Sequence, residues 1–118
     1  MPITDVFLTE RDADTLILTP IVNLSELEYA EPVTQEVYGL LQDDTVKNLV
    51  IDFHRTDYFG STALGFFVRL WKKIQLRNGK MAFCCLSTHE AEILRITRLD
   101  EFWEIRPTRE EALKAVSA

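Results

Sequence analysis

The order of apolar and polar positions along the chain predicts strands and helices in alternation. Residues 6–22 predict two strands that meet at a polar turn over residues 11–14. Residues 47–53 and 81–86 are strongly apolar and predict buried strands. Residues 47–53 are too apolar for a strand with one solvent-exposed face, so we expect this strand in the centre of a sheet. A short strand is predicted at residues 102–105.

Helical spacing of apolar residues predicts helices within residues 25–42, from residue 63 onward, and within residues 87–99 and 107–116. In the second helix, the apolar stripe expected to face the sheet consists of Leu64, Phe67, Val68, Trp71 and Ile74. In the third helix, the apolar positions include Ala91, Leu94 and Leu99. The cations near the end of the second helix suit its dipole, and Asn78-Gly79 suits a left-handed end.

Strands alternating with helices imply a layered α/β architecture with a partly parallel sheet. The first two strands are close enough to pair as a hairpin, so the sheet should be mixed. We therefore expect residues 1–118 to form a single α/β domain, with about four to five strands packed against about four helices.

The helix starts differ in how completely their first N–H groups are provided with partners. A capping box needs Ser or Thr followed three residues later by Glu or Gln. The chain carries three such pairs: Ser25 with Glu28, Ser87 with Glu90, and Thr108 with Glu111. After Ser61 and Thr62, the corresponding residues are Leu64 and Gly65. This helix start is therefore a candidate anion or phosphoserine site, with a plain Ser cap as the alternative.

Composition limits the functions that the chain can have. With 47% hydrophobic and 27% charged residues it can form a core, and a net charge of −6 argues against binding nucleic acid or an anionic membrane. Neither a membrane-spanning run nor a signal peptide is recognisable, so a cytoplasmic location is expected. Cys84 and Cys85 are expected as core residues on opposite faces of a strand.

No pattern of residues points to catalysis. His54 and His89 are the only histidines, and they lack the spacing of metal ligands. A nucleophile elbow, a phosphate-binding P-loop and a dinucleotide-binding glycine motif are all missing. We expect no enzyme activity, no metal and no cofactor.

The stretch VIDFHRTDYFGSTALGFF, residues 50–67, resembles the phosphorylation-site region of STAS domains in anti-sigma-factor antagonists. In that register Asp52 is the acid at the strand end and Asp57 the loop acid. Ser61 falls on the phosphorylated serine and Thr62 on its neighbour. The resemblance continues through residues 77–87 and 93–113, whereas the first forty residues match in pattern only.

Three positions depart from the family pattern. Gly60 replaces the Asp before the phosphorylated serine, and Ala63 replaces a Gly. Asn23 stands where antagonists often carry an Asp. These changes leave the expected fold intact and bear on whether Ser61 is phosphorylated.

The resemblance implies a partner switch, in which the unphosphorylated domain binds an anti-sigma factor that is also a serine kinase, and a phosphatase reverses the modification. Phosphorylation is expected at Ser61, with Thr62 as second choice. Phe66 and Leu70 are expected off the buried stripe, in an apolar docking patch with Tyr58 and Phe59 or packed under a neighbouring helix. The expected partner-binding residues are Asn23, Asp57, Tyr58, Phe59, Gly60, Ser61, Thr62, Ala63, Phe66 and Leu70. The alternative is a non-switching STAS interaction, scaffold or small-ligand-binding module.

Overall fold

A computed structural model describes residues 3–24 and 31–117 and confirms the α/β class. Its five strands are β1 (Phe7–Asp12), β2 (Thr15–Pro20), β3 (Asn48–Asp52), β4 (Met81–Cys84) and β5 (Glu104–Arg106). Its α-helices are α1 (Glu31–Leu41), α2 (Ser61–Gln75), α3 (Thr88–Ile96) and α4 (Arg109–Ser117). Two 3-10 turns, η1 (Ile3–Asp5) and η2 (Leu99–Glu101), complete the described elements.

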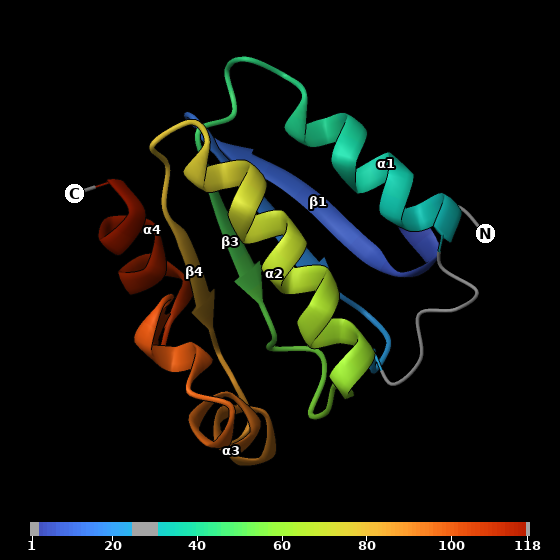
Figure 1. Ribbon diagram of the computed structural model, residues 1–118, viewed down its shortest axis with the longest axis vertical. Helices are drawn as coiled ribbons and strands as arrows, with labels where there is room; N and C mark the ends of the chain where they lie inside the picture. The colour runs from blue at the N-terminus through green and yellow to red at the C-terminus, as the bar shows by residue number, and fades with distance from the viewer. Residues whose placement is uncertain (1–2, 25–30, 118) are drawn as a thin grey trace.

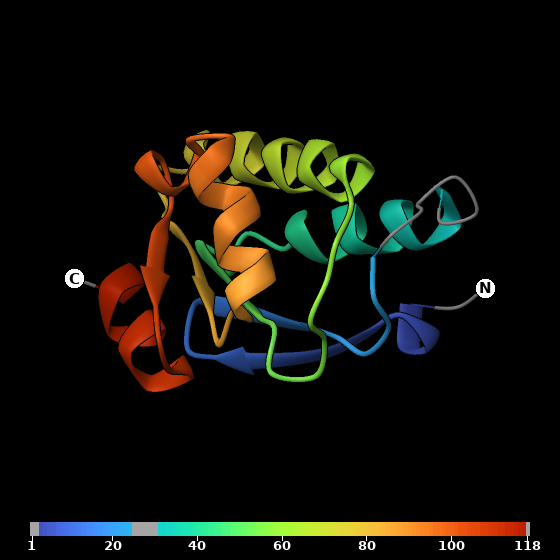
Figure 2. The ribbon, with the colours of Figure 1, turned by 90° about the horizontal axis from the view of Figure 1, so that it is seen from below.

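The sheet runs in the order β1-β2-β3-β4-β5, which places β3 at its centre as predicted. β1 and β2 form the expected antiparallel hairpin, and the other three pairings are parallel. Helices α1, α2 and α3 lie on one face of the sheet and α4 lies on the other (Figures 1 and 2). The mixed sheet therefore has helices on both faces.

The two-sided cover explains why the middle of β3, residues 49–51, is apolar at every position. Leu49 and Ile51 belong to the large core beneath α1 and α2. Val50 points to the opposite face and packs with Ala112 and Val116 of α4. Because successive strand residues point to opposite faces, a strand covered on both sides needs apolar residues at consecutive positions.

The buried face of α2 is wider than predicted. Phe67 and Ile74 of the predicted stripe are fully buried, and its other residues, Leu64, Val68 and Trp71, pack against the same core. Phe66 and Leu70, expected off the stripe, are 1% and 0% exposed, whereas Leu64 and Val68 are only partly buried. The Phe66 ring lies 6.1 Å from the ring of Phe7, at the N-terminal end of β1. The buried face of α2 extends toward β1, so the helix has a wider buried stripe than one facing only the central strands would need.

The cysteines also depart from prediction. Cys84 is fully buried under α4, but Cys85 packs against the same cluster instead of pointing to the opposite face. The reason is that β4 ends at Cys84, and Cys85 has a left-handed backbone with φ of 60°. Alternation of side chains holds only within the extended strand.

Two of the capping pairs predicted from the sequence have capping contacts in the structure. Ser87 and Glu90 form the predicted reciprocal capping box of α3, and Thr108 accepts a hydrogen bond from the Glu111 N–H. The predicted box of Ser25 and Glu28 lies outside the described residues. The third helix is shorter than predicted, because left-handed Arg98 ends it and Leu99 begins η2.

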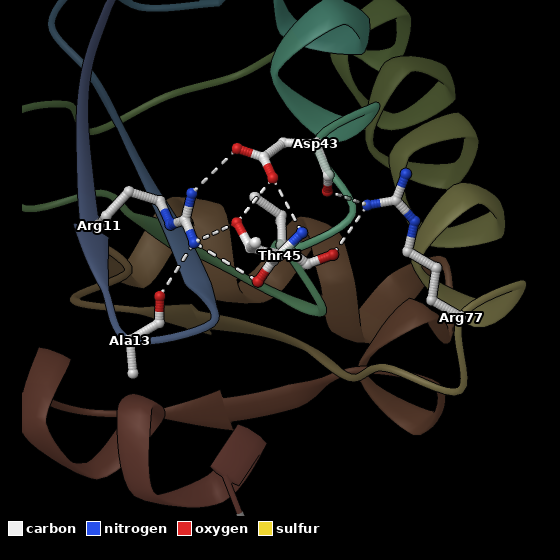
Figure 3. Close-up of polar contacts among 6 residues, drawn as sticks. Arg11, Ala13, Asp43, Thr45 and Arg77 are labelled. Carbon is white, nitrogen blue, oxygen red and sulfur yellow. Dashed lines mark hydrogen bonds and ion pairs between the residues drawn. The ribbon is translucent and has the colours of Figure 1, made fainter.

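The connection from α1 to β3 is held by arginines from two other elements (Figure 3). Arg11 of β1 donates to the Thr45 hydroxyl at 3.0 Å and pairs with Asp43 at 3.5 Å. Arg77, just past α2, donates to the carbonyl oxygens of Asp43 and Val46. Close packing also fixes Gly79, where an added Cβ would lie 1.8 Å from the Lys47 carbonyl oxygen.

We predict that Phe66→Ala lowers the free energy of unfolding by about 3–5 kcal/mol, because it empties a fully enclosed ring site. Denaturant unfolding would measure the change. Leu76→Ala is the control, since Leu76 is 87% exposed and should lose little. Wild-type stability in Phe66→Ala would contradict the burial of this ring.

Candidate functional site

The candidate site lies where the loop after β3 leads into α2, at the carboxyl end of the central strand. Ser61 and Thr62 are the first two residues of α2 and both are exposed. The N-cap is Gly60, and it makes no side-chain cap. Ser61 is thus not the plain cap that the alternative interpretation required.

The first turn of α2 keeps N–H groups without acceptors. Ala63 and Leu64 donate to the Gly60 carbonyl oxygen at 3.1 and 3.4 Å. Among the described residues, the backbone N–H groups of Ser61 and Thr62 have no acceptor, and neither does the Ser61 hydroxyl have a partner. Together with the helix dipole, these groups favour a negative charge at the exposed end of the helix.

The segment that follows β2 holds the loop between β3 and α2 from one side, through Asn23 and Leu24. The Asn23 amide nitrogen donates to Asp57 Oδ1 at 3.1 Å, and the Asp57 N–H donates back to Asn23 Oδ1 at 3.3 Å. Leu24 forms an isolated parallel bridge with Phe59, and the Gly60 N–H donates to the Leu24 carbonyl oxygen at 2.9 Å. Asn23 and Asp57 are therefore brought together next to the start of α2.

The N-terminus of α3 fixes the same loop from the other side. Ser87 Oγ donates to the Asp57 carbonyl oxygen at 2.7 Å while accepting the Glu90 N–H at 3.1 Å. Glu90 accepts from the Ser87 N–H and from the Thr56 hydroxyl, both at 2.9 Å. The capping box of α3 thus positions the loop that presents Ser61.

The structure separates the predicted partner-binding residues into two groups. Phe59, Gly60, Ala63, Phe66 and Leu70 are buried, so the apolar docking patch proposed from the sequence does not exist on this surface. Phe59 instead packs against Phe53 and Phe67 with ring centroids 5.3 Å apart. The residues that remain at the surface are Asn23, Asp57, Ser61 and Thr62, with Tyr58 half-buried against the ring of His89.

Sequence reasoning missed a buried ion pair behind the loop. Asp52, only 2% exposed, accepts from Arg109 Nε and from the His54 N–H, both at 2.9 Å. Burial alone would raise the pKa of Asp52, but the hydrogen bonds from His54 and Arg109 outweigh it and lower that pKa. Arg109 lies 57 residues further along the chain. The pair could therefore have been predicted only from the arrangement of the strands and of α4 in the fold.

Glu90 is a buried carboxylate with the opposite shift. Burial raises its pKa, and nearby Asp57 adds to the increase, whereas hydrogen bonds from Ser87 and Thr56 only partly compensate. No cation pairs with Glu90 within the described part of the chain. The difference between the two carboxylates therefore comes from Arg109 and His54, which Asp52 has and Glu90 lacks.

One group of potential metal ligands lies close to this site. The ligand atoms of Asp52, Cys84 and Cys85 lie within 4.8 Å of one another. Both oxygens of Asp52 are occupied by His54 and Arg109, and burial raises the pKa of both thiols. A metal would have to displace these hydrogen bonds and protons, so the donor set does not favour one.

Comparison with protein families matches residues 9–112 to the STAS domain, and the chain belongs to this family. An anti-sigma-factor antagonist (STAS) domain protein from Planctomyces limnophilus shares 28% identity and a TM-score of 0.84, covering 95% of this chain and 98% of that one. A putative anti-sigma factor antagonist from Thermotoga maritima shares 24% identity and a TM-score of 0.85, covering 95% of both chains.

A more distant match has the same fold. Bacillus SpoIIAA in its phosphorylated form shares 16% identity with a TM-score of 0.72, covering 93% of this chain and 98% of that chain. The chain is thus a STAS domain that shares its fold with these three proteins. Among its described helices, none has both the length and the apolar character needed to cross a membrane.

We predict that Glu90→Gln becomes more stable relative to wild type as the pH rises. The raised pKa means that folded Glu90 holds its proton more tightly than the unfolded chain does. Wild type therefore loses stability as the pH rises from the ordinary value of 4.5 through the raised pKa. Gln keeps an amide oxygen for the capping box but does not ionise.

Urea unfolding of both proteins over this pH range would measure the difference. Glu36→Gln, at an exposed position of α1 with no ion pair among the described residues, is the control and should follow wild type at every pH. If the free energy of unfolding changed with pH equally in Glu90→Gln and wild type, burial would not raise the pKa of Glu90.

Proposed function

We propose that this protein is an anti-sigma-factor antagonist whose binding to an anti-sigma factor with serine kinase activity is controlled by phosphorylation of Ser61. The observation that carries the proposal is an exposed serine at the first position of α2, above N–H groups that have no acceptor within the described residues. Family membership and the fold match to SpoIIAA, a protein with a phosphorylated form, support it.

The geometry supports a serine that is modified by a partner, and not one that attacks a substrate. A nucleophilic serine needs a base within hydrogen-bonding reach. In the described residues the Ser61 hydroxyl has no such contact, and His54 Nδ1 is engaged 2.9 Å from Asp52. We infer that the protein is not an enzyme and that a phosphatase restores its unmodified form.

A phosphate at Ser61 would act on the partner more than on the fold. It adds roughly −1.5 to −2 charges, which the first N–H groups and the dipole of α2 can accept. The surrounding surface already carries Asp57. A partner packed on this surface would have to desolvate both negative groups, and that cost would break the complex.

The surface available to the partner is polar. Its described residues are Asn23, Asp57, Ser61, Thr62 and the exposed part of Tyr58. The loop before α2 is held by two hydrogen bonds, from Ser87 Oγ to the Asp57 carbonyl oxygen and from the Gly60 N–H to the Leu24 carbonyl oxygen. Such a rigid surface needs little reorganisation on binding, which favours recognition of the unphosphorylated form. We place the interaction in the cytoplasm, where these partners would act.

The replacement of the family Asp by Gly60 favours one alternative, a STAS module that binds its partner without a switch. Gly60 is buried and supplies no carboxylate at the position directly before Ser61 for a kinase to recognise. The same absence removes a charge that would repel a phosphate. Binding measurements on charged variants distinguish the two.

We predict that Ser61→Ala binds the anti-sigma factor like wild type and that Ser61→Asp binds at least about tenfold more weakly, about 1.4 kcal/mol. Calorimetry with the partner, identified by pull-down from the native lysate, would measure both. Thr62→Asp tests whether the effect belongs to position 61, and Ser117→Asp at the end of α4 controls for net charge. Equal binding by all variants would leave a constitutive module.

A further inference from the structure

One stretch of the chain has a net positive charge. Residues 58–89 contain no Asp or Glu, although the whole chain carries a net charge of −6. The Lys and Arg residues of this stretch are Arg69, Lys72, Lys73, Arg77 and Lys80. The second half of α2 is therefore basic on an otherwise acidic protein.

Helices α1 and α2 lie side by side (Figures 1 and 2). Three of these cations line a groove on the surface that the two helices form. A hollow of about 340 Å³ is bordered by Tyr38 of α1, by Arg69, Lys72 and Lys73 of α2, and by Leu76. An adjoining hollow of about 190 Å³ shares Tyr38, Lys73 and Leu76. The two hollows form one groove, which we call the α1–α2 groove.

Tyr38 orients two of the cations. Arg69 Nε donates to the Tyr38 hydroxyl oxygen at 2.9 Å. The Lys73 ammonium lies 4.4 Å from the centroid of the Tyr38 ring. Because only Nε of the guanidinium is used in this contact, the terminal nitrogens of Arg69 remain as paired donors of the kind that bind phosphate oxygens.

Among the described side chains, no carboxylate pairs with these three cations. Across residues 3–24 and 32–117, Arg69, Lys72 and Lys73 form no ion pair. The hollow between β1 and α1 has the same volume, but its arginine, Arg11, pairs with Asp43. Arg77 is also committed, since it donates to two main-chain carbonyl oxygens (Figure 3).

We propose that the α1–α2 groove binds a small soluble phosphate anion, either pyrophosphate or a phosphate ester. The terminal nitrogens of Arg69 take two oxygens of the phosphate, and Lys72 and Lys73 neutralise its remaining charge. Leu76, which is 87% exposed, offers an apolar contact for the organic part of an ester. The net charge of −6 opposes an extended anionic surface such as a membrane but does not prevent a small anion from reaching three local cations.

Isothermal titration calorimetry with pyrophosphate on the purified chain tests the proposal. Wild type should show saturable binding that weakens with added salt. The double variant Arg69→Gln, Lys72→Gln should bind at least about tenfold more weakly. Lys114→Gln, which removes an exposed cation from α4 on the opposite face of the sheet, should bind like wild type.

Tyr38→Phe tests how the groove is built. It keeps the ring beneath Lys73 but removes the hydroxyl that orients Arg69, so we expect weaker pyrophosphate binding with an unchanged melting temperature. An unchanged affinity would show that Arg69 needs no positioning.

Two outcomes overturn the proposal. The first is no saturable heat with pyrophosphate up to about 10 mM, or equal binding by wild type and the double variant, either of which leaves the cations as a solvated surface. The second is binding to phosphatidylglycerol vesicles, lost in the double variant, without binding to pyrophosphate. That result would assign the groove to a lipid headgroup.

Discussion

The buried carboxylate of Asp52 connects the layers of this fold at the end of the central strand. It receives Arg109 from α4 and the backbone N–H of His54 at the start of the loop that carries the candidate site. Arg109 also reaches the Thr19 hydroxyl on β2 and Glu10 on β1. Losing one partner of a buried pair leaves an uncompensated charge, which costs about 3–5 kcal/mol. The loop therefore begins from a point that strands β1 to β3 and α4 all help to fix.

The loop is held again at its far end, by residues from two other segments. Asn23 and Ser87 both bond to Asp57, and Leu24 bonds to Gly60 immediately before α2. Because the contacts come from opposite sides, Ser61 is presented by a backbone that cannot shift without breaking several hydrogen bonds. A phosphate added there changes the charge of a rigid surface. This is why we attribute the proposed switch to repulsion and desolvation at the interface and not to a rearrangement of the domain.

The sequence predicted the order of elements because their patterns are local. A central strand covered on both faces has apolar residues at consecutive positions, as at residues 49–51, and a capping box spans only four residues. Both β3 and the start of α3 could therefore be recognised directly. The full width of the buried face of α2 could not be recognised, since Phe66 packs against Phe7, which is distant in the chain. Cys85 was misplaced because the alternation rule was applied past the last extended residue.

The site was predictable to a similar extent. The exposed hydroxyls of Ser61 and Thr62 and the incomplete capping box were visible in the sequence. The partners that hold the loop were not, because Asn23 and Ser87 each lie at least 30 residues from Asp57. Their roles depend on strand order, which brings the ends of β2, β3 and β4 to one edge of the sheet.

The two ends of helix α2 offer different polar groups to an anion. Its N-terminus offers N–H groups to a negative charge at Ser61, whereas its second half carries the cations of the α1–α2 groove. Twelve residues separate Ser61 from Lys73, about 18 Å at the helical rise. The Debye length at physiological salt is about 8 Å, so a charge at one end is largely screened from the other. Occupation of the groove and phosphorylation of Ser61 should therefore be independent unless a partner spans both, and a partner that did so would couple the two through its own contacts.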